Sequence, residues 1–108
     1  MTGLPKRPDI VRLWAEKAEH DLLNVDNNLT DSHVPWDTVC FHAQQGAVKY
    51  LKALLTQYGV VFPKIHDLTE LVALLPAGAC PALPPGILEA LNPYAIETRY
   101  PGVWEPIE

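Results

Sequence analysis

The 108-residue sequence contains no apolar run that approaches the roughly 18 residues needed to cross a membrane as a helix. Proline and glycine interrupt its longest uncharged stretches, and its first residues lack the apolar segment of a secretory signal peptide. We therefore expect a cytoplasmic protein that makes no contact with a membrane.

Motifs for metal ions and for phosphate loops are also missing. The two cysteines, Cys40 and Cys80, form no Cys-x-x-Cys pattern and no Cys/His cluster with zinc spacing. No glycine-rich phosphate loop is present either. We therefore expect no metal site and no cofactor.

Basic residues are scarce. Lysine and arginine number 8 against 13 acidic residues, which gives a formal net charge of −5. General nucleic-acid binding needs many contacts from Lys and Arg to phosphates, so this balance argues against it. A small basic patch remains possible, because a total charge does not fix where the charges lie.

No alternating apolar–polar pattern of useful length occurs, so nothing predicts a β-sheet. Helical periodicity is present instead in four segments, residues 8–29, 35–58, 67–75 and 85–91. Because short links join these segments, we predict a single domain over residues 1–108. Its fold class is all-α, an up-and-down antiparallel bundle of four principal helices. Residues 1–8 are expected to be a flexible leader and residues 93–108 an irregular C-terminal tail.

Apolar side chains recur along one face of each long segment, and we predict that they form the core. The first stripe is Ile10, Trp14, Ala18, Leu22, Val25 and Leu29. The second stripe is Trp36, Cys40, Ala43, Ala47, Leu51, Leu54 and Tyr58. Gly46 also lies in the second segment, where glycine costs about 1 kcal/mol relative to alanine. It suits either the close approach of another backbone, such as a dimer partner, or simple tolerance in a well-packed bundle.

A polar stripe follows the same helix. His42, Gln45, Lys49 and Lys52 recur at spacings of three, four and three, which stacks them on one face. Such a stripe can bind a polyanion or a partner. It can equally be an ordinary solvated face, and the sequence leaves both interpretations open.

Four short motifs then occur in order along the chain. They are Ala-Glu-His-Asp-Leu at 18–22, Phe-His-Ala-Gln-Gln-Gly-Ala-Val-Lys-Tyr-Leu-Lys-Ala-Leu-Leu at 41–55, Lys-Ile-His-Asp-Leu at 64–68 and Thr-Arg-Tyr-Pro at 98–101. Over about residues 10–102 this series resembles the HEPN domains, a family of small helical bundles.

The resemblance implies a protein that forms a homodimer and pairs with a minimal nucleotidyltransferase, commonly as a toxin–antitoxin pair. Many members of the family are metal-independent ribonucleases that use an Arg, four to six intervening residues and a His. Other members lack this motif and are described only as nucleotide-binding or as having no known role.

This chain departs from the ribonuclease pattern. Seven residues separate Arg12 from His20, and no histidine follows Arg99. Val48 replaces the usual Glu of the second motif. The family typically continues with another long helix after Arg-Tyr-Pro, and we expect that this helix is either missing from this chain or replaced by a partner or a symmetry mate. The departures favour a non-catalytic protein that binds a nucleotide or an RNA phosphate, or that partners a nucleotidyltransferase.

We expect the phosphate to lie in a cationic cleft. Its predicted ligand-binding residues are His42, Gln45, Lys49, Lys52, His66, Arg99 and Tyr100. Each has a structural alternative: His66 can cap and pack a helix, and Arg99 can anchor the tail. Asp21, beside an apolar stripe, is expected to form a structural ion pair with Lys49, Lys52 or Arg99.

Two further functions stay open. One is a ribonuclease in which His66 or His42 transfers a proton while Arg99 stabilises the charged transition state. The other is a dimeric scaffold that binds no anion.

Overall fold

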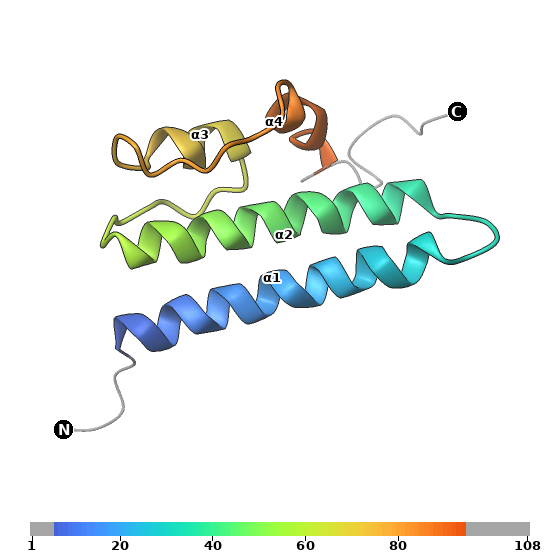
Figure 1. The fold of residues 1–108 in the computed structure, drawn as a ribbon, viewed down its shortest axis with the longest axis horizontal. Coiled ribbons are helices and arrows are strands. Elements are labelled where there is room, and N and C mark those ends of the chain that lie inside the picture. Colours follow the sequence, from blue (N-terminus) through green and yellow to red (C-terminus); the bar gives the residue numbers. More distant parts are fainter. Residues whose placement is uncertain (1–5, 95–108) are drawn as a thin grey trace.

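The computed structural model describes residues 6–94 (Figure 1). All regular secondary structure in this range is helical, which confirms the predicted all-α class. The helices are α1 (Arg7–Leu29), α2 (Trp36–Gln57), α3 (Leu68–Ala73) and α4 (Ile87–Leu91). Helices α1 and α2 are long, whereas α3 and α4 are each only one or two turns. Among the described residues, no helix is long and apolar enough to cross a membrane.

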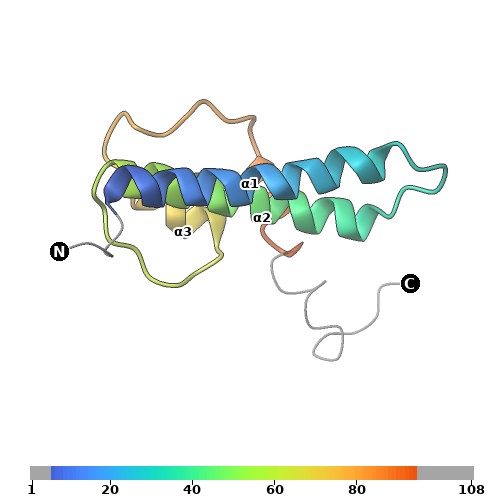
Figure 2. The ribbon, with the colours of Figure 1, turned by 90° about the horizontal axis from the view of Figure 1, so that it is seen from below.

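The two long helices run antiparallel and side by side along the longest dimension of the molecule (Figures 1 and 2). They approach closely at Gly46, where an added Cβ would lie 3.4 Å from Leu22 Cδ2 and 3.6 Å from the Ala18 carbonyl oxygen. The backbone that comes near Gly46 is therefore α1 of the same chain.

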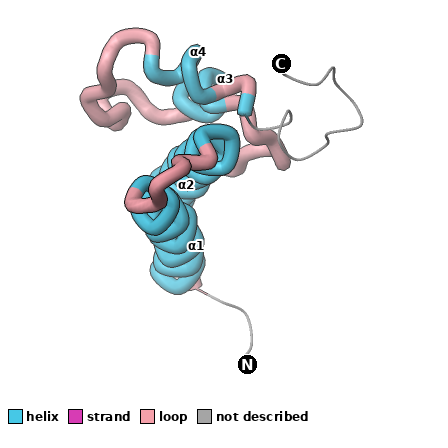
Figure 3. The backbone as a smooth tube through the Cα atoms, turned by 90° about the vertical axis from the view of Figure 1, so that its right-hand side faces the viewer, coloured by secondary structure: helices cyan, strands magenta, loops and turns pink. Residues whose placement is uncertain are grey.

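The short helices α3 and α4 pack on the side of α2 that faces away from α1 (Figure 3). Helix α2 thus forms a middle layer with neighbours on two sides. Its Val48, Leu51 and Leu55 bury against Leu68 and Leu71 of α3, and these five residues form the central cluster of the hydrophobic core.

The middle-layer position of α2 overturns part of the predicted core. Trp36 is 61% exposed and Tyr58 is 51% exposed, although both belong to the predicted apolar stripe. On α1, Leu22 and Leu29 are also exposed. On α2 the prediction was wrong because a single stripe assumes one neighbouring face, whereas α2 turns different faces toward α1 and toward α3. On α1 it was wrong because α1 packs chiefly against α2, which leaves part of the α1 stripe uncovered.

The connection between α2 and α3 determines where the site lies. Gly59, with a φ of 73°, ends the helix in the left-handed conformation that favours glycine. The chain then doubles back along α2, and Val60, Phe62 and Ile65 pack against the core. Residues 60–67 are therefore held beside α2, and they bring Lys64 and His66 close to the polar stripe.

Candidate functional site

A cavity of about 320 Å³ opens between α1, α2 and this connection. Basic side chains reach it from two elements: Lys49 and Lys52 from α2, and Lys64 and His66 from the connection. Among the residues that the structure describes, none that lines this cavity carries a carboxylate. The described lining residues are Trp14, Gln45, Val48, Lys49, Lys52, Phe62, Pro63, Lys64 and His66. We call this space the cationic cavity.

Lys52 is the most unusual of these groups, because it is only 4% exposed. Its ammonium nitrogen lies 5.3 Å from the centre of the Trp14 ring and 5.8 Å from that of Phe62. The two rings meet edge to face at 6.4 Å, so both can stabilise the cation through their π faces. Burial lowers the pKa of Lys52, and the positive charges of Lys49 and Lys64 lower it further.

Asp21 of α1 holds two members of the polar stripe. Its Oδ2 lies 2.7 Å from Lys49 Nζ, and its Oδ1 lies 2.8 Å from His42 Nδ1. Asp21 is 6% exposed, so the carboxylate is buried but has two partners. His42 is thereby directed at α1, and it does not line the cationic cavity.

Two buried glutamines fix the connection to α2. Gln45 donates from Nε2 to Gln44 Oε1 at 2.6 Å, and Gln44 donates from Nε2 to the His66 carbonyl oxygen at 2.8 Å. Gln44 is fully buried. This short chain of hydrogen bonds sets the backbone position of His66 relative to the lysines.

The polar stripe is consequently not a solvated face. Gln45 and Lys52 are at least 95% buried, and Lys49 is half-buried through its pairing with Asp21. The structure brings Gln45, Lys49, Lys52 and His66 around one cavity. Arg99 and Tyr100 lie outside the described residues.

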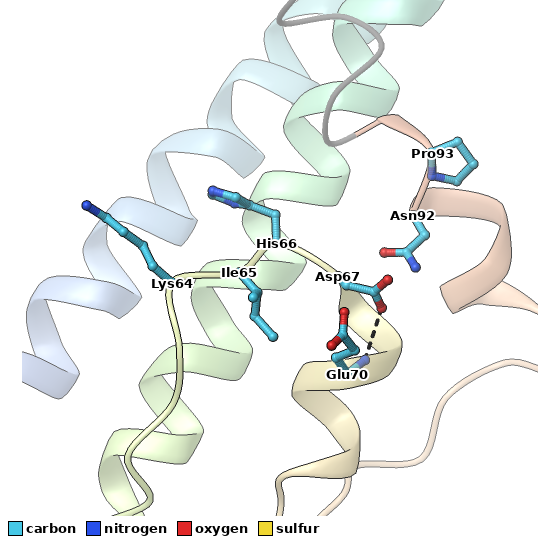
Figure 4. A pocket seen from close by; sticks show the side chains of 7 residues that line it. All are labelled: Lys64, Ile65, His66, Asp67, Glu70, Asn92 and Pro93. Atoms are coloured by element: carbon cyan, nitrogen blue, oxygen red, sulfur yellow. Dashed lines mark hydrogen bonds between the residues drawn. The ribbon is translucent and has the colours of Figure 1, made fainter.

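A second cavity of about 570 Å³ adjoins the first and shares Lys64 and His66 with it (Figure 4). Its remaining lining comes from Ile65 of the connection, from the start of α3 and from the end of α4. The lining residues are Lys64, Ile65, His66, Asp67, Glu70, Asn92 and Pro93. We call this space the acidic cavity, after Asp67 and Glu70.

Backbone N–H groups at the start of α3 already donate to side chains of this protein. Asp67 Oδ1 accepts a hydrogen bond from the Glu70 N–H at 3.0 Å, and Asn92 Oδ1 accepts one from the Leu68 N–H at 2.8 Å. The Glu70 N–H, and after it the Asn92 side chain, hold the pKa of Asp67 below its ordinary value. The first turn of α3 therefore offers no phosphate site, and Asp67 is its N-cap.

Sequence reasoning missed five of the described lining residues of the cationic cavity: Trp14, Val48, Phe62, Pro63 and Lys64. Trp14 was assigned only to the core, and Phe62 and Lys64 were left in a connector. Lys64 stands in the quoted motif at 64–68, two residues before His66, and this proximity was the available signal.

Comparison with known proteins gives one match. The family model described as the HEPN domain matches residues 11–108. No curated protein matches the chain, and no solved structure does.

Proposed function

This chain belongs to the HEPN domain family, and we propose that it is a non-catalytic member that binds the phosphate group of a nucleotide or an RNA. The observation that carries the proposal is the convergence of Lys49, Lys52, Lys64 and His66 on one cavity, to which residues 6–94 contribute no carboxylate. Ammonium groups and an imidazole are suitable donors to phosphate oxygens.

The energetics of Lys52 support an anionic ligand. A buried ammonium is costly unless a negative charge or a hydrogen-bond acceptor faces it. Asp21 bonds to Lys49 and His42, and the described contacts of the Lys52 cation are to aromatic rings. A phosphate in the cavity would offset the mutual repulsion of Lys49, Lys52 and Lys64, which now lowers the pKa of Lys52.

The experiment is a titration of the protein with inorganic phosphate, followed by amide chemical shifts and by calorimetry. We expect shifts at Lys49, Lys64 and His66. Lys64→Met, at an exposed position, should weaken phosphate binding about tenfold, the loss expected for one charge-assisted hydrogen bond.

The matched control is Lys17→Met, which removes an equally exposed lysine of α1 that lines neither cavity. It should leave phosphate binding unchanged. Unmoved amides around the cavity, or equal losses in both variants, would contradict the proposal.

One contact favours a second candidate function, a metal-independent ribonuclease. Asp21 holds His42 Nδ1 at 2.8 Å, and a carboxylate that orients an imidazole in this way is typical of general acid–base sites. The absent Arg-x4–6-His spacing counts against this candidate. RNA cleavage by the wild type, His42→Ala and His66→Ala separates the two: the same background rate in all three rejects the enzyme.

Association is a further part of the proposal. The family resemblance implies a homodimer and a minimal nucleotidyltransferase partner in a toxin–antitoxin-type pair, and the exposed rings of Trp36 and Tyr58 support some protein contact. Light scattering and co-purification with a co-expressed nucleotidyltransferase test this part. Stable self-association without phosphate binding would instead favour the structural scaffold.

A further inference from the structure

We infer that the two cavities form one bipartite site for a ribonucleoside monophosphate with a free vicinal diol. The cationic cavity would hold the phosphate, and Glu70 in the acidic cavity would accept hydrogen bonds from the ribose hydroxyls. This inference rests on the proposed function, because it places the phosphate in the same cationic cavity.

The cavities lie next to each other at Lys64 and His66, which line both of them. In Figure 4 these two side chains extend away from α3, while Asp67, Glu70 and Asn92 surround the other side of the opening. A ligand that spans both cavities would contact Lys64 with one end and the start of α3 with the other. Both volumes, about 320 and 570 Å³, lie within the range of small-ligand cavities, about 300–1,000 Å³.

The acidic cavity contains carboxylates where the cationic cavity contains lysines, and this difference determines which chemical group of the ligand can lie beside α3. A carboxylate accepts hydrogen bonds and repels phosphate, so the part of a nucleotide beside α3 must be a hydrogen-bond donor without negative charge. Glu70 is the available acceptor: it is exposed and forms no ion pair within residues 6–94. Paired ribose hydroxyls are donors that Asp and Glu bind in nucleotide sites.

The same carboxylates argue against a polynucleotide along this path. A chain that left the cationic cavity through the opening would bring its next phosphate toward Asp67 and Glu70. A mononucleotide carries its only phosphate at one end and avoids this repulsion.

The experiment compares three probes: inorganic phosphate, adenosine 5′-monophosphate and its 2′,3′-dideoxy counterpart. The wild type should bind the ribonucleotide about tenfold more tightly than the dideoxy nucleotide. Glu70→Gln should abolish that preference and leave the affinity for inorganic phosphate unchanged. The control, Glu89→Gln, changes an exposed carboxylate of α4 outside both cavities and should keep the preference.

A second measurement does not depend on any variant. In the wild type, the ribonucleotide should shift the amides of Glu70 and Asn92, and the dideoxy nucleotide should shift them less. The control titration is inorganic phosphate, which should shift only amides of the cationic cavity.

The outcomes separate this inference from the proposed function. Phosphate binding with equal affinities for the two nucleotides, in the wild type and in Glu70→Gln, overturns the diol contact and leaves the phosphate site standing. Failure of all three probes overturns both. An RNA oligonucleotide that binds much more tightly than the mononucleotide overturns the choice of ligand alone.

Discussion

Lys52 is the residue whose buried charge has opposite effects on stability and on phosphate binding. Lys52→Met keeps an unbranched side chain beside Trp14 and removes the charge. Because the cost of burying the ammonium disappears together with a modest cation–π contact, we expect the free energy of unfolding to stay within about 1 kcal/mol of the wild type, or to rise. Denaturant unfolding measures this, and phosphate titration of the same variant should show that binding is lost. A loss of several kcal/mol would mean that the charge itself supports the fold.

The lowered pKa of Lys52 also gives two pH dependences of opposite sign. Between that pKa and the ordinary value of 10.5, the unfolded chain binds more protons at this residue than the folded chain does. The contribution of Lys52 to the free energy of unfolding therefore increases as pH rises through this window. Phosphate affinity decreases over the same window, because the ammonium loses its charge.

Subtracting the pH profile of the unfolding free energy of Lys52→Met from that of the wild type isolates the effect on stability, and the pH dependence of phosphate affinity is measured on the wild type. Unfolding is followed with denaturant and binding by calorimetry. If the difference in stability decreased with pH, the pKa of Lys52 would be raised in the folded state and the burial argument would fail.

At the scale of the helices, the contact between α1 and α2 has room for an additional methyl group at Gly46. An added Cβ at Gly46 would meet its nearest neighbours at 3.4–3.6 Å, which is ordinary van der Waals contact. Gly46→Ala should therefore raise the free energy of unfolding by about 1 kcal/mol, the difference in helix propensity.

Thermal or denaturant unfolding of Gly46→Ala checks this expectation. Gly59→Ala is the contrasting variant, because its φ of 73° disfavours alanine and its Cβ would meet the Arg7 guanidinium at 3.1 Å. That substitution should destabilise the protein. Destabilisation by Gly46→Ala would show that α1 and α2 pack more tightly than these distances indicate.

The helices themselves were predictable, but the faces they bury were not. Periodicity and stop signals placed both long helices to within a residue or two of α1 and α2. The exposure of Trp36 and Tyr58 was not predictable, because it follows from α2 having neighbours on two sides. A sequence pattern records which residues are apolar and leaves open how many elements will cover them.

In the candidate site, too, some residues could be placed together from the sequence and others could not. Lys49 and Lys52 share a helix face, so their spacing alone brought them together. Phe62 and Lys64 reach the cavity only because Gly59 turns the chain back along α2, and helical periodicity carries no information about such a connection. Trp14 was assigned to packing because an aromatic ring on an apolar stripe is usually part of a core.

At the scale of the whole molecule, a cationic cavity lies in an acidic protein. The formal net charge is −5 and the pI is about 5.2, so the field at a distance repels a polyanion even though the cavity attracts one phosphate. Basic nucleic-acid binders gain affinity steeply as salt is removed, because counterions are released from the nucleic acid. Here the long-range repulsion opposes that gain.

We therefore expect the affinity for a single-stranded RNA of about 20 nucleotides to change little when ionic strength falls from about 0.15 M to about 0.01 M, where the Debye length grows from about 8 to 30 Å. Fluorescence anisotropy of a labelled RNA measures this, with adenosine 5′-monophosphate titrated in parallel. A steep rise in RNA affinity at low salt would require many Lys–phosphate contacts outside the cationic cavity. Weak and nearly salt-independent RNA binding follows if one local phosphate site opposes a repulsive overall field.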